Sequence, residues 1–250
     1  MHKFFVTAEA VSGGLITISG PDARHIRTVL RLGVGDGILI TDGAGTEHVS
    51  RICRFAQGAV FARIEATAHP VREPKVPLQL IQALPKSDKM DFVVQKCTEI
   101  GVSRFVPVIT DRTIPRPDAS RAVDRVARWR RVAGEAAKQC GRGRIPDVEP
   151  ITDLANAARS CTQAGGLLLL PWELERTRTL RHALDTLDPE SRPSVSFAVG
   201  PEGGFSHSEV EAACDLGAVT VTLGHRILRT ETAGIVMASI ILYHMGEIGC

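Results

Sequence analysis

Three nearly continuous apolar runs in the last third of the chain constrain its fold most strongly. They cover residues 167–170, 195–199 and 219–223, and helical patterns lie between them. Strands that are apolar on both faces are typical of a parallel sheet covered by helices on both sides. Two earlier runs, 78–83 and 104–109, continue the same alternation with helices. The sequence therefore predicts an α/β domain with a parallel sheet over residues 78–250.

The helical patterns carry their own start and stop signals. Ser87 is placed to cap a helix that Gly101 ends, and a long helix with an apolar stripe and an arginine-rich face is predicted over about 119–140. The last helix follows Thr230 or Thr232, either of which is placed to cap it, and is apolar all round. Such a helix is predicted to be buried in a core or in a subunit interface.

The first 70 residues have a different rhythm. Short strands are predicted at 4–6, 15–18, 37–40, 47–52 and 59–64, with one helix capped by Asp22 and stopped by Gly33. This pattern predicts a small β-barrel with one helix. Three prolines between His69 and Pro77 favour a linker. The predicted domains are therefore 1–70 and 78–250, joined by a linker at 71–77.

Charge and cysteine usage limit the classes of partner. Residues 112–144 contain ten basic and three acidic side chains, which indicates either a local anionic partner or a solvated arginine-rich helix. The six cysteines form no C-x-x-C pair, so free thiols are expected and no metal site is predicted. No signal-peptide pattern and no apolar run of about 20 residues is present, so we expect a cytoplasmic protein without a membrane span.

Two glycine-bearing turns follow apolar strands and form the candidate site. Gly200-Pro-Glu-Gly-Gly204 precedes a helix whose start is a capping box of Ser206 and Glu209. Its spacing fits neither a dinucleotide fold nor a P-loop, and Glu202 would repel phosphate; a carboxylate suits a ribose hydroxyl or a sulfonium better. The plainer reading is a tight turn without a ligand.

The second turn, Gly224 to Ala233, crowds Arg226, Arg229 and Glu231 beside the apolar last helix. The plainer reading is an ion-pair cluster that closes a loop. The position of both turns at strand ends favours a binding site, because open α/β sheets bind ligands at the carboxyl ends of their strands. The segment Leu170-Pro-Trp-Glu173 follows a third strand and is predicted to form another wall.

These motifs together resemble a known family. Gly200-Pro-Glu-Gly-Gly, followed by Leu223-Gly-x-Arg-Ile-Leu-Arg-x-Glu-Thr-Ala233, is similar to the S-adenosylmethionine site of SPOUT methyltransferases. More closely, the chain resembles the bacterial 16S ribosomal RNA (uracil-1498-N3)-methyltransferase family, RsmE. Further matches are 25–31, 84–91, 96–101 and Glu135-x-x-x-Gln139-x-x-Arg142. Lys3 and Ser87 depart from the family pattern, where Arg and Gly are more frequent.

The resemblance implies a fold and an activity. It implies a deep trefoil knot over residues 195–240, a PUA-like RNA-binding barrel before it, and a homodimer that acts on 16S ribosomal RNA in the assembled small subunit. The expected reaction is methylation of N3 of uridine 1498 by S-adenosylmethionine. Cofactor-binding residues are then predicted at Leu170, Pro171, Gly200, Pro201, Glu202, Gly203, Gly204, Leu223, Gly224, Ile227, Leu228, Thr232 and Ala233.

Roles in the reaction follow from the same resemblance. N3 of uridine carries a proton, so Arg229 is expected to stabilise negative charge that develops on the base, and Glu202 or Glu231 to accept the proton or to hold the ribose or sulfonium. RNA contacts are expected at Lys3, Arg24, Arg27, Arg31, Lys86, Lys89, Arg112 and Arg142. Two alternatives stay open: a SPOUT enzyme that methylates the ribose 2′-oxygen, and a non-catalytic ribosome assembly factor.

Overall fold

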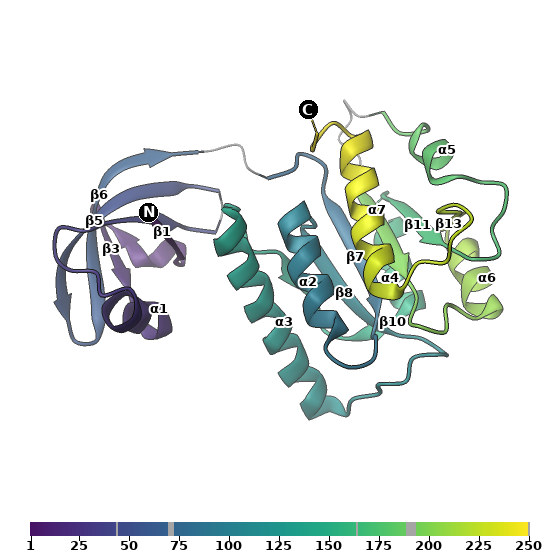
Figure 1. Cartoon of the computed structure of the whole chain (residues 1–250), viewed down its shortest axis with the longest axis horizontal. Coiled ribbons are helices and arrows are strands. Elements are labelled where there is room, and N and C mark those ends of the chain that lie inside the picture. Colours follow the sequence, from purple (N-terminus) through teal and green to yellow (C-terminus); the bar gives the residue numbers. More distant parts are fainter. Residues whose placement is uncertain (44, 70–72, 164, 189–193, 250) are drawn as a thin grey trace. The chain divides into compact units, whose positions relative to one another are not determined.

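The computed structural model describes residues 1–43, 45–69, 73–163, 165–188 and 194–249 (Figure 1). The chain forms two compact units. The first contains Met1–Glu73 and Ala137–Ile145, and the second contains Pro74–Ala136 and Pro146–Cys250.

The first unit is built on a six-stranded sheet of order β1-β4-β5-β6-β3-β2. The β1·β4 pair is parallel and the other pairs are antiparallel. Its core consists mainly of isoleucines from alternate strand positions, together with Ile26 from the helical segment. The strands are β1 (His2–Phe5), β2 (Val11–Ser12), β3 (Leu15–Ile18), β4 (Gly37–Thr41), β5 (Glu47–Ala56) and β6 (Ala59–Ala68).

The predicted helix of the first unit starts earlier than expected and is irregular. Helix α1 spans Gly20–Arg24 and continues as a π-helical turn over His25–Val29. Asp22 was expected to cap this helix, but it lies inside α1 and its Oδ1 accepts a hydrogen bond from Lys138 Nζ at 2.9 Å. The Asp22 carboxylate therefore forms a long-range ion pair with Lys138 and does not cap the helix.

A segment of the second half of the chain belongs to the first unit. The Lys3 ammonium donates to the Gly141 carbonyl at 3.0 Å, and the Thr41 hydroxyl donates to the Gly143 carbonyl at 3.1 Å. Glu73 accepts from Arg142 Nη2 at 2.6 Å. The two-domain expectation did not include this crossing, because sequence adjacency says nothing about residues 137–145 returning to an earlier sheet.

The second unit is built on a seven-stranded sheet in which β10-β8-β7-β12-β11-β13 are neighbours in that order and β9 pairs with β8. All of its pairings are parallel, as predicted from the apolar runs. The strands are β7 (Leu78–Ala83), β8 (Arg104–Ile109), β9 (Asp147–Val148), β10 (Thr152–Asp153), β11 (Leu167–Pro171), β12 (Val195–Val199) and β13 (Val219–Val221).

Helices cover both faces of this sheet. One hydrophobic cluster joins α2, α3, α5 and α7 to one face, and a second joins α4 and α6 to the other (Figure 1). Alternate residues of β7 enter different clusters, Leu78 and Leu80 one and Ile81 and Ala83 the other. The helices are α2 (Lys89–Ile100), α3 (Ala119–Cys140), α4 (Leu154–Gln163), α5 (Leu180–Leu184), α6 (His207–Asp215) and α7 (Thr230–His244).

The helix termini agree closely with the sequence signals. Helix α3 has the predicted bounds, and the capping box of Ser206 and Glu209 is present at the start of α6. Gly101 ends α2 with φ of 130°, a conformation that favours glycine. The cap of α2 is Asp88 rather than Ser87, because Ser87 itself has φ of 56°.

Helix α7 departs from the prediction at its N-terminal cap. Its N-cap is Arg229, with no side-chain cap, while the Thr230 hydroxyl donates to the Gly200 carbonyl at 2.7 Å. The helix is buried on one side only, since Ile240 is 40% exposed and Tyr243 is 68% exposed. The core of this chain therefore covers one side of α7, and its other apolar edge faces outward, where the predicted alternative of a subunit interface would place it.

Candidate active site

A cavity of about 620 Å³ opens where β11, β12 and β13 end. Its walls are the three loops that follow these strands, at 171–176, 199–205 and 222–230, completed by Lys89 from α2 and Ala233 from α7. Because parallel strands end at the same edge of a sheet, loops distant in sequence converge there. The volume lies within the range of small-molecule sites, which is about 300–1,000 Å³.

The first glycine turn leaves almost no room for side chains. A Cβ atom on Gly200 would lie 3.2 Å from the Cα of Gly204, and Gly204 has φ of 67°. A Cβ atom on Gly204 would lie 2.9 Å from Oε2 of Glu173, which follows the neighbouring strand. The turn therefore presents its backbone at the cavity wall.

A buried polar chain ties this turn to α7. Gln82 is fully buried in β7, and its Nε2 donates to Thr230 Oγ1 at 2.9 Å. The Thr230 hydroxyl in turn donates a hydrogen bond to the Gly200 carbonyl. Gln82 Oε1 has no hydrogen-bond donor in the described part of the chain. This chain fixes the start of α7 against the turn after β12.

Lys89 joins two carboxylates. Its Nζ lies 2.9 Å from Glu202 Oε1 and 3.3 Å from Glu231 Oε2, and the Lys86 backbone N–H donates to Glu202 Oε1 at 3.1 Å. The hydrogen bond to Glu202 raises the pKa of Lys89 above its usual value. Burial alone would raise the pKa of Glu202, but the donors from Lys89 and the backbone outweigh it and lower that pKa. The Lys89 ammonium and the Glu202 carboxylate are therefore held in their charged forms.

The loop after β11 is held by a different carboxylate. Glu175 accepts the backbone N–H groups of Thr177 and Arg178 at 2.8 and 3.1 Å, and the hydroxyls of Thr177 and Thr220 at 2.8 Å each. These donors, the backbone ones first, lower the pKa of Glu175 to about 2. The loop is thereby fixed to β13.

Several charged groups in the cavity remain unpaired. Among the described residues, Glu173, Arg176, Arg226 and Arg229 have no side-chain hydrogen bond or ion pair, although all four line the cavity. Unpaired charges in a concave site are available to a ligand.

Most of the predicted cofactor-binding residues line this cavity. Three do not: Leu170 is fully buried in the second cluster, Thr232 is exposed outside the cavity, and Gly203 faces Arg112, whose Nη1 donates to its carbonyl at 2.7 Å. The residues brought together are Pro171, Gly200, Pro201, Glu202, Gly204, Leu223, Gly224, Ile227, Leu228 and Ala233. Of the three predicted catalytic residues, Arg229 and Glu202 line the cavity, whereas Glu231 does not line it and pairs with Lys89.

Two of the predicted RNA-binding cations require correction. Lys3 forms an ion pair with Glu47, and their side chains are 6% and 5% exposed, respectively. The Arg142 side chain is 5% exposed and pairs with Glu73. Neither cation is presented to a ligand. Lys89 lies in the cavity, Lys86 and Arg112 are exposed beside the first glycine turn, and Arg24, Arg27 and Arg31 are exposed on the first unit.

Sequence reasoning did not identify the supporting residues of the site. Gln82 and Thr230 carry the buried contact to Gly200, and Arg176 lines the cavity. The position of Gln82 in an apolar run did indicate a structural role, because a buried amide in a parallel strand requires a hydrogen-bond partner. No comparable signal exists for Arg176.

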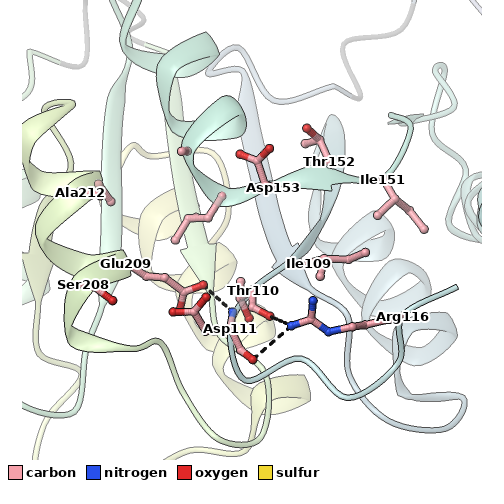
Figure 2. A pocket seen from close by; sticks show the side chains of 13 residues that line it. Ile109, Thr110, Asp111, Arg116, Ile151, Thr152, Asp153, Ser208, Glu209 and Ala212 are labelled. Carbon is pink, nitrogen blue, oxygen red and sulfur yellow. Dashed lines mark hydrogen bonds between the residues drawn. The ribbon is translucent and has the colours of Figure 1, made fainter.

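A second cavity, of about 700 Å³, lies where β8 and β10 end, and residues of α4 and α6 also line it (Figure 2). Its polar groups are already engaged: Glu209 accepts the Asp111 backbone N–H at 2.7 Å, and Arg116 Nη2 donates to the carbonyls of Thr110 and Asp111 at 3.3 Å each. Asp153 accepts from the Asn156 N–H at 2.8 Å. This second cavity therefore offers few free polar groups, and the cavity at the ends of β11, β12 and β13 is the better candidate.

Within the described ranges, no group of three or more metal-ligating side chains gathers. In the same residues, no helix combines the length and apolar character that a membrane crossing requires.

Comparison with known proteins places this site in a family. The RNA methyltransferase domain family matches residues 72–242, and the RNA methyltransferase PUA domain family matches residues 18–52. A Mycobacterium bovis protein named ribosomal RNA small subunit methyltransferase E is 31% identical over 93% of this chain and 88% of its own length.

Two solved structures are also similar. The ribosomal RNA small subunit methyltransferase E of Neisseria gonorrhoeae, bound to S-adenosyl methionine, has a TM-score of 0.84 and 31% identity over 97% of each chain. A methyltransferase from Legionella pneumophila, in complex with the same cofactor, has a TM-score of 0.80 and 29% identity over 96% of each chain. The chain therefore belongs to the RNA methyltransferase family whose curated members are named ribosomal RNA small subunit methyltransferase E.

Proposed function

We propose that this protein transfers the methyl group of S-adenosylmethionine to N3 of uridine 1498 in 16S ribosomal RNA. The observation that carries the proposal is the cavity at the carboxyl ends of β11, β12 and β13, walled by two glycine turns, in a chain similar to a relative solved with this cofactor. The target nucleotide comes from the resemblance to the uracil-1498-N3 family.

The residues of the cavity fit S-adenosylmethionine. The backbone at Gly200, Gly204 and Gly224 lies open to a ligand, and no atom lies within 4 Å of the place where a Cβ on Gly224 would stand. Together with Leu223 and Leu228 these groups would hold the adenosine, because glycine permits close approach of backbone to ligand. When bound, the cofactor supplies an electrophilic methyl group on a sulfonium.

Arg229 is the residue proposed to stabilise negative charge on the uracil. Its guanidinium lines the cavity and has no partner among the described residues, so it is free to donate to a carbonyl oxygen of the base. Arg229→Ala should abolish turnover with a smaller effect on cofactor affinity. Unchanged turnover would remove Arg229 from the mechanism.

The remaining features of the family are proposed with the activity. Residues 195–240 form the deep trefoil knot, and the first unit is a PUA-like barrel that binds RNA. We propose a homodimer formed through α7, whose outward edge carries Ile240 and Tyr243. The substrate is the assembled small subunit in the cytoplasm, contacted by Arg24, Arg27, Arg31, Lys86 and Arg112.

The test is methyl transfer from labelled S-adenosylmethionine to small subunits from a strain that lacks the modification, followed by reverse transcription. N3-methyluridine blocks base pairing, so a single transcriptase stop at uridine 1498 is expected. Label on a ribose, found by nucleoside analysis, would favour the 2′-O-methyltransferase. Absence of both label and cofactor binding would favour the assembly factor.

A further inference from the structure

A proton acceptor is required in the cavity if uridine N3 is the methylated atom. N3 carries a proton at neutral pH, and that proton has to leave as the bond to carbon forms. A side chain that accepts it must lie in the cavity and must have a free acceptor atom. Among the described residues, the acidic side chains that line the cavity are Glu173 and Glu202, and Glu231 pairs with Lys89, which also lines it.

Two of these carboxylates are engaged. Glu202 accepts from the Lys89 ammonium and from the Lys86 N–H, and these donors hold its pKa below the usual value, which makes it a weaker base. Glu231 pairs with the same ammonium and is not one of the residues that line the cavity. Protonating either one would break an ion pair that joins α2, the first glycine turn and α7.

Glu173 differs from both. It lines the cavity, it is exposed, and within the described part of the chain its carboxylate has no hydrogen-bond donor and no ion-pair partner. It follows β11, which lies between β12 and β13, so it stands between the two glycine turns proposed to hold the cofactor. Its Oε1 and Oε2 lie 3.1 and 2.9 Å from the place of a Cβ on Gly204, so the missing side chain at 204 makes room for this carboxylate.

The loop that carries Glu173 is anchored close to it. Glu175, two residues on, anchors the loop through four hydrogen bonds to Thr177, Arg178 and Thr220. His225, on the exposed loop 224–227, also lines the cavity and has the chemistry of a base, so the variants below include it. General-base catalysis depends on a fixed distance between acceptor and proton.

We infer that Glu173 is the catalytic residue that accepts the N3 proton of the target uridine. This inference rests on the proposed function. The N3–H bond breaks and its proton passes to the Glu173 carboxylate, while the N3 electron pair forms the bond to the methyl carbon. The electrons of the carbon–sulfur bond remain on sulfur, which leaves as a neutral thioether, and Glu173 then returns its proton to water.

The test is the pH dependence of methyl transfer by Glu173→Gln, which keeps the size and removes the base. At saturating cofactor we expect kcat to fall by about 10²- to 10⁴-fold, the usual contribution of a general base. The residual rate should rise about tenfold per pH unit, because only uridine already deprotonated at N3 reacts. The wild type should not show this slope. Cofactor affinity, followed by the fluorescence of Trp172 in the cavity wall, should be unchanged.

Controls separate this role from others. Glu211→Gln changes a carboxylate on the surface of α6, where Glu211 and His207 are each 68% exposed, and should retain wild-type rates and pH dependence. His225→Gln should not acquire the steep pH slope; if it does while Glu173→Gln does not, the acceptor is His225. Weaker cofactor binding by Glu173→Gln at unchanged kcat would assign Glu173 to the cofactor and overturn the inference.

The failure of the proposed function gives a different result. If the wild type forms no N3-methyluridine, the proposed reaction itself is wrong. If the wild type forms it and Glu173→Gln forms it at the same rate, only the assignment of the proton acceptor is wrong. Unchanged thermal unfolding of Glu173→Gln shows that a loss of rate is not a loss of fold.

Discussion

Lys89 and Glu231 form an ion pair at the start of α7, beside the active site: Lys89 Nζ lies 3.3 Å from Glu231 Oε2. This oxygen is buried, and no hydrogen-bond donor reaches it from the described residues. The ion pair with Lys89 is therefore the main interaction that offsets the free-energy cost of burying this carboxylate oxygen. Because Lys89 also binds Glu202, one ammonium links the ends of two helices and a glycine turn.

Lys89→Met is expected to destabilise the second unit by about 1–3 kcal/mol, because it leaves a buried carboxylate oxygen without a counter-charge. The free energy of unfolding in urea measures this. Lys96→Met is the matched control, since Lys96 pairs with Glu99 three residues on in the same helix, and such local pairs contribute about 0.2–0.5 kcal/mol. Equal losses in the two variants would contradict a special role for Lys89.

The lowered pKa of Glu175 predicts that the folded protein loses stability in acid. Its pKa in the folded protein is about 2 and its ordinary value is 4.5, so its contribution is fully present above pH 4.5. That contribution is lost as the pH falls from 4.5 toward 2, because the unfolded chain then binds a proton that the folded chain does not. The difference in unfolding free energy between wild type and Glu175→Gln should therefore shrink over this window. A difference that stays constant from pH 7 to about pH 2.5 would contradict the lowered pKa.

Much of the second unit was predictable from local pattern. The apolar runs predicted the parallel strands, and the apolar stripe of residues 119–140 predicted the bounds of α3. Such features depend on neighbours within a few residues, where periodicity and capping act. The lining of the cavity was also largely predictable, because glycine turns at strand ends converge at one edge of a parallel sheet.

The pairing of side chains was not predictable in the same way. Lys3 and Arg142 look like surface cations in the sequence, but each meets a carboxylate from a distant segment, Glu47 and Glu73 respectively. Lys89 likewise stands 113 positions from Glu202, and no local pattern relates them. Whether a cation is free for a ligand is decided by tertiary contacts, which periodicity and composition do not describe.

Gly204→Ala separates backbone strain from the placement of Glu173. Residue 204 has φ of 67°, which costs an L-residue about 1–2 kcal/mol, and the new Cβ would meet the Glu173 carboxylate at 2.9 Å. Gly165→Ala is the control, because φ there is 74° and no atom lies within 4 Å of the new Cβ. Both variants should lose similar stability in urea unfolding, whereas Gly204→Ala alone should lose methyl transfer. Equal activity would show that the position of Glu173 is unimportant.

Thr230→Val tests the buried polar chain. The substitution removes the donor to the Gly200 carbonyl and one acceptor for Gln82, so it should cost about 1–3 kcal/mol and weaken cofactor binding through the displaced turn. Thr232→Val makes the same change two residues on in α7, at an exposed position outside the cavity. Calorimetric unfolding and a binding isotherm for S-adenosylmethionine distinguish the two. A loss of the same size in Thr232→Val would point to helix propensity instead of the hydrogen bonds.

Substituting the exposed Arg27 and the buried Lys3, both on the first unit, should have opposite effects on RNA binding and on stability. Arg27 is exposed and has no ion-pair partner among the described residues, so Arg27→Ala should weaken binding to small-subunit RNA and reduce the slope of log affinity against log salt by about 1, with stability unchanged. Lys3→Met should leave that slope unchanged in the folded protein and destabilise the unit, because it removes the ammonium that pairs with the buried Glu47 carboxylate. Binding titrations at several salt concentrations and urea unfolding of both variants decide between these roles. A reduced salt slope in Lys3→Met at full stability would mean that this ammonium does reach RNA, and that its pairing with Glu47 opens when RNA binds.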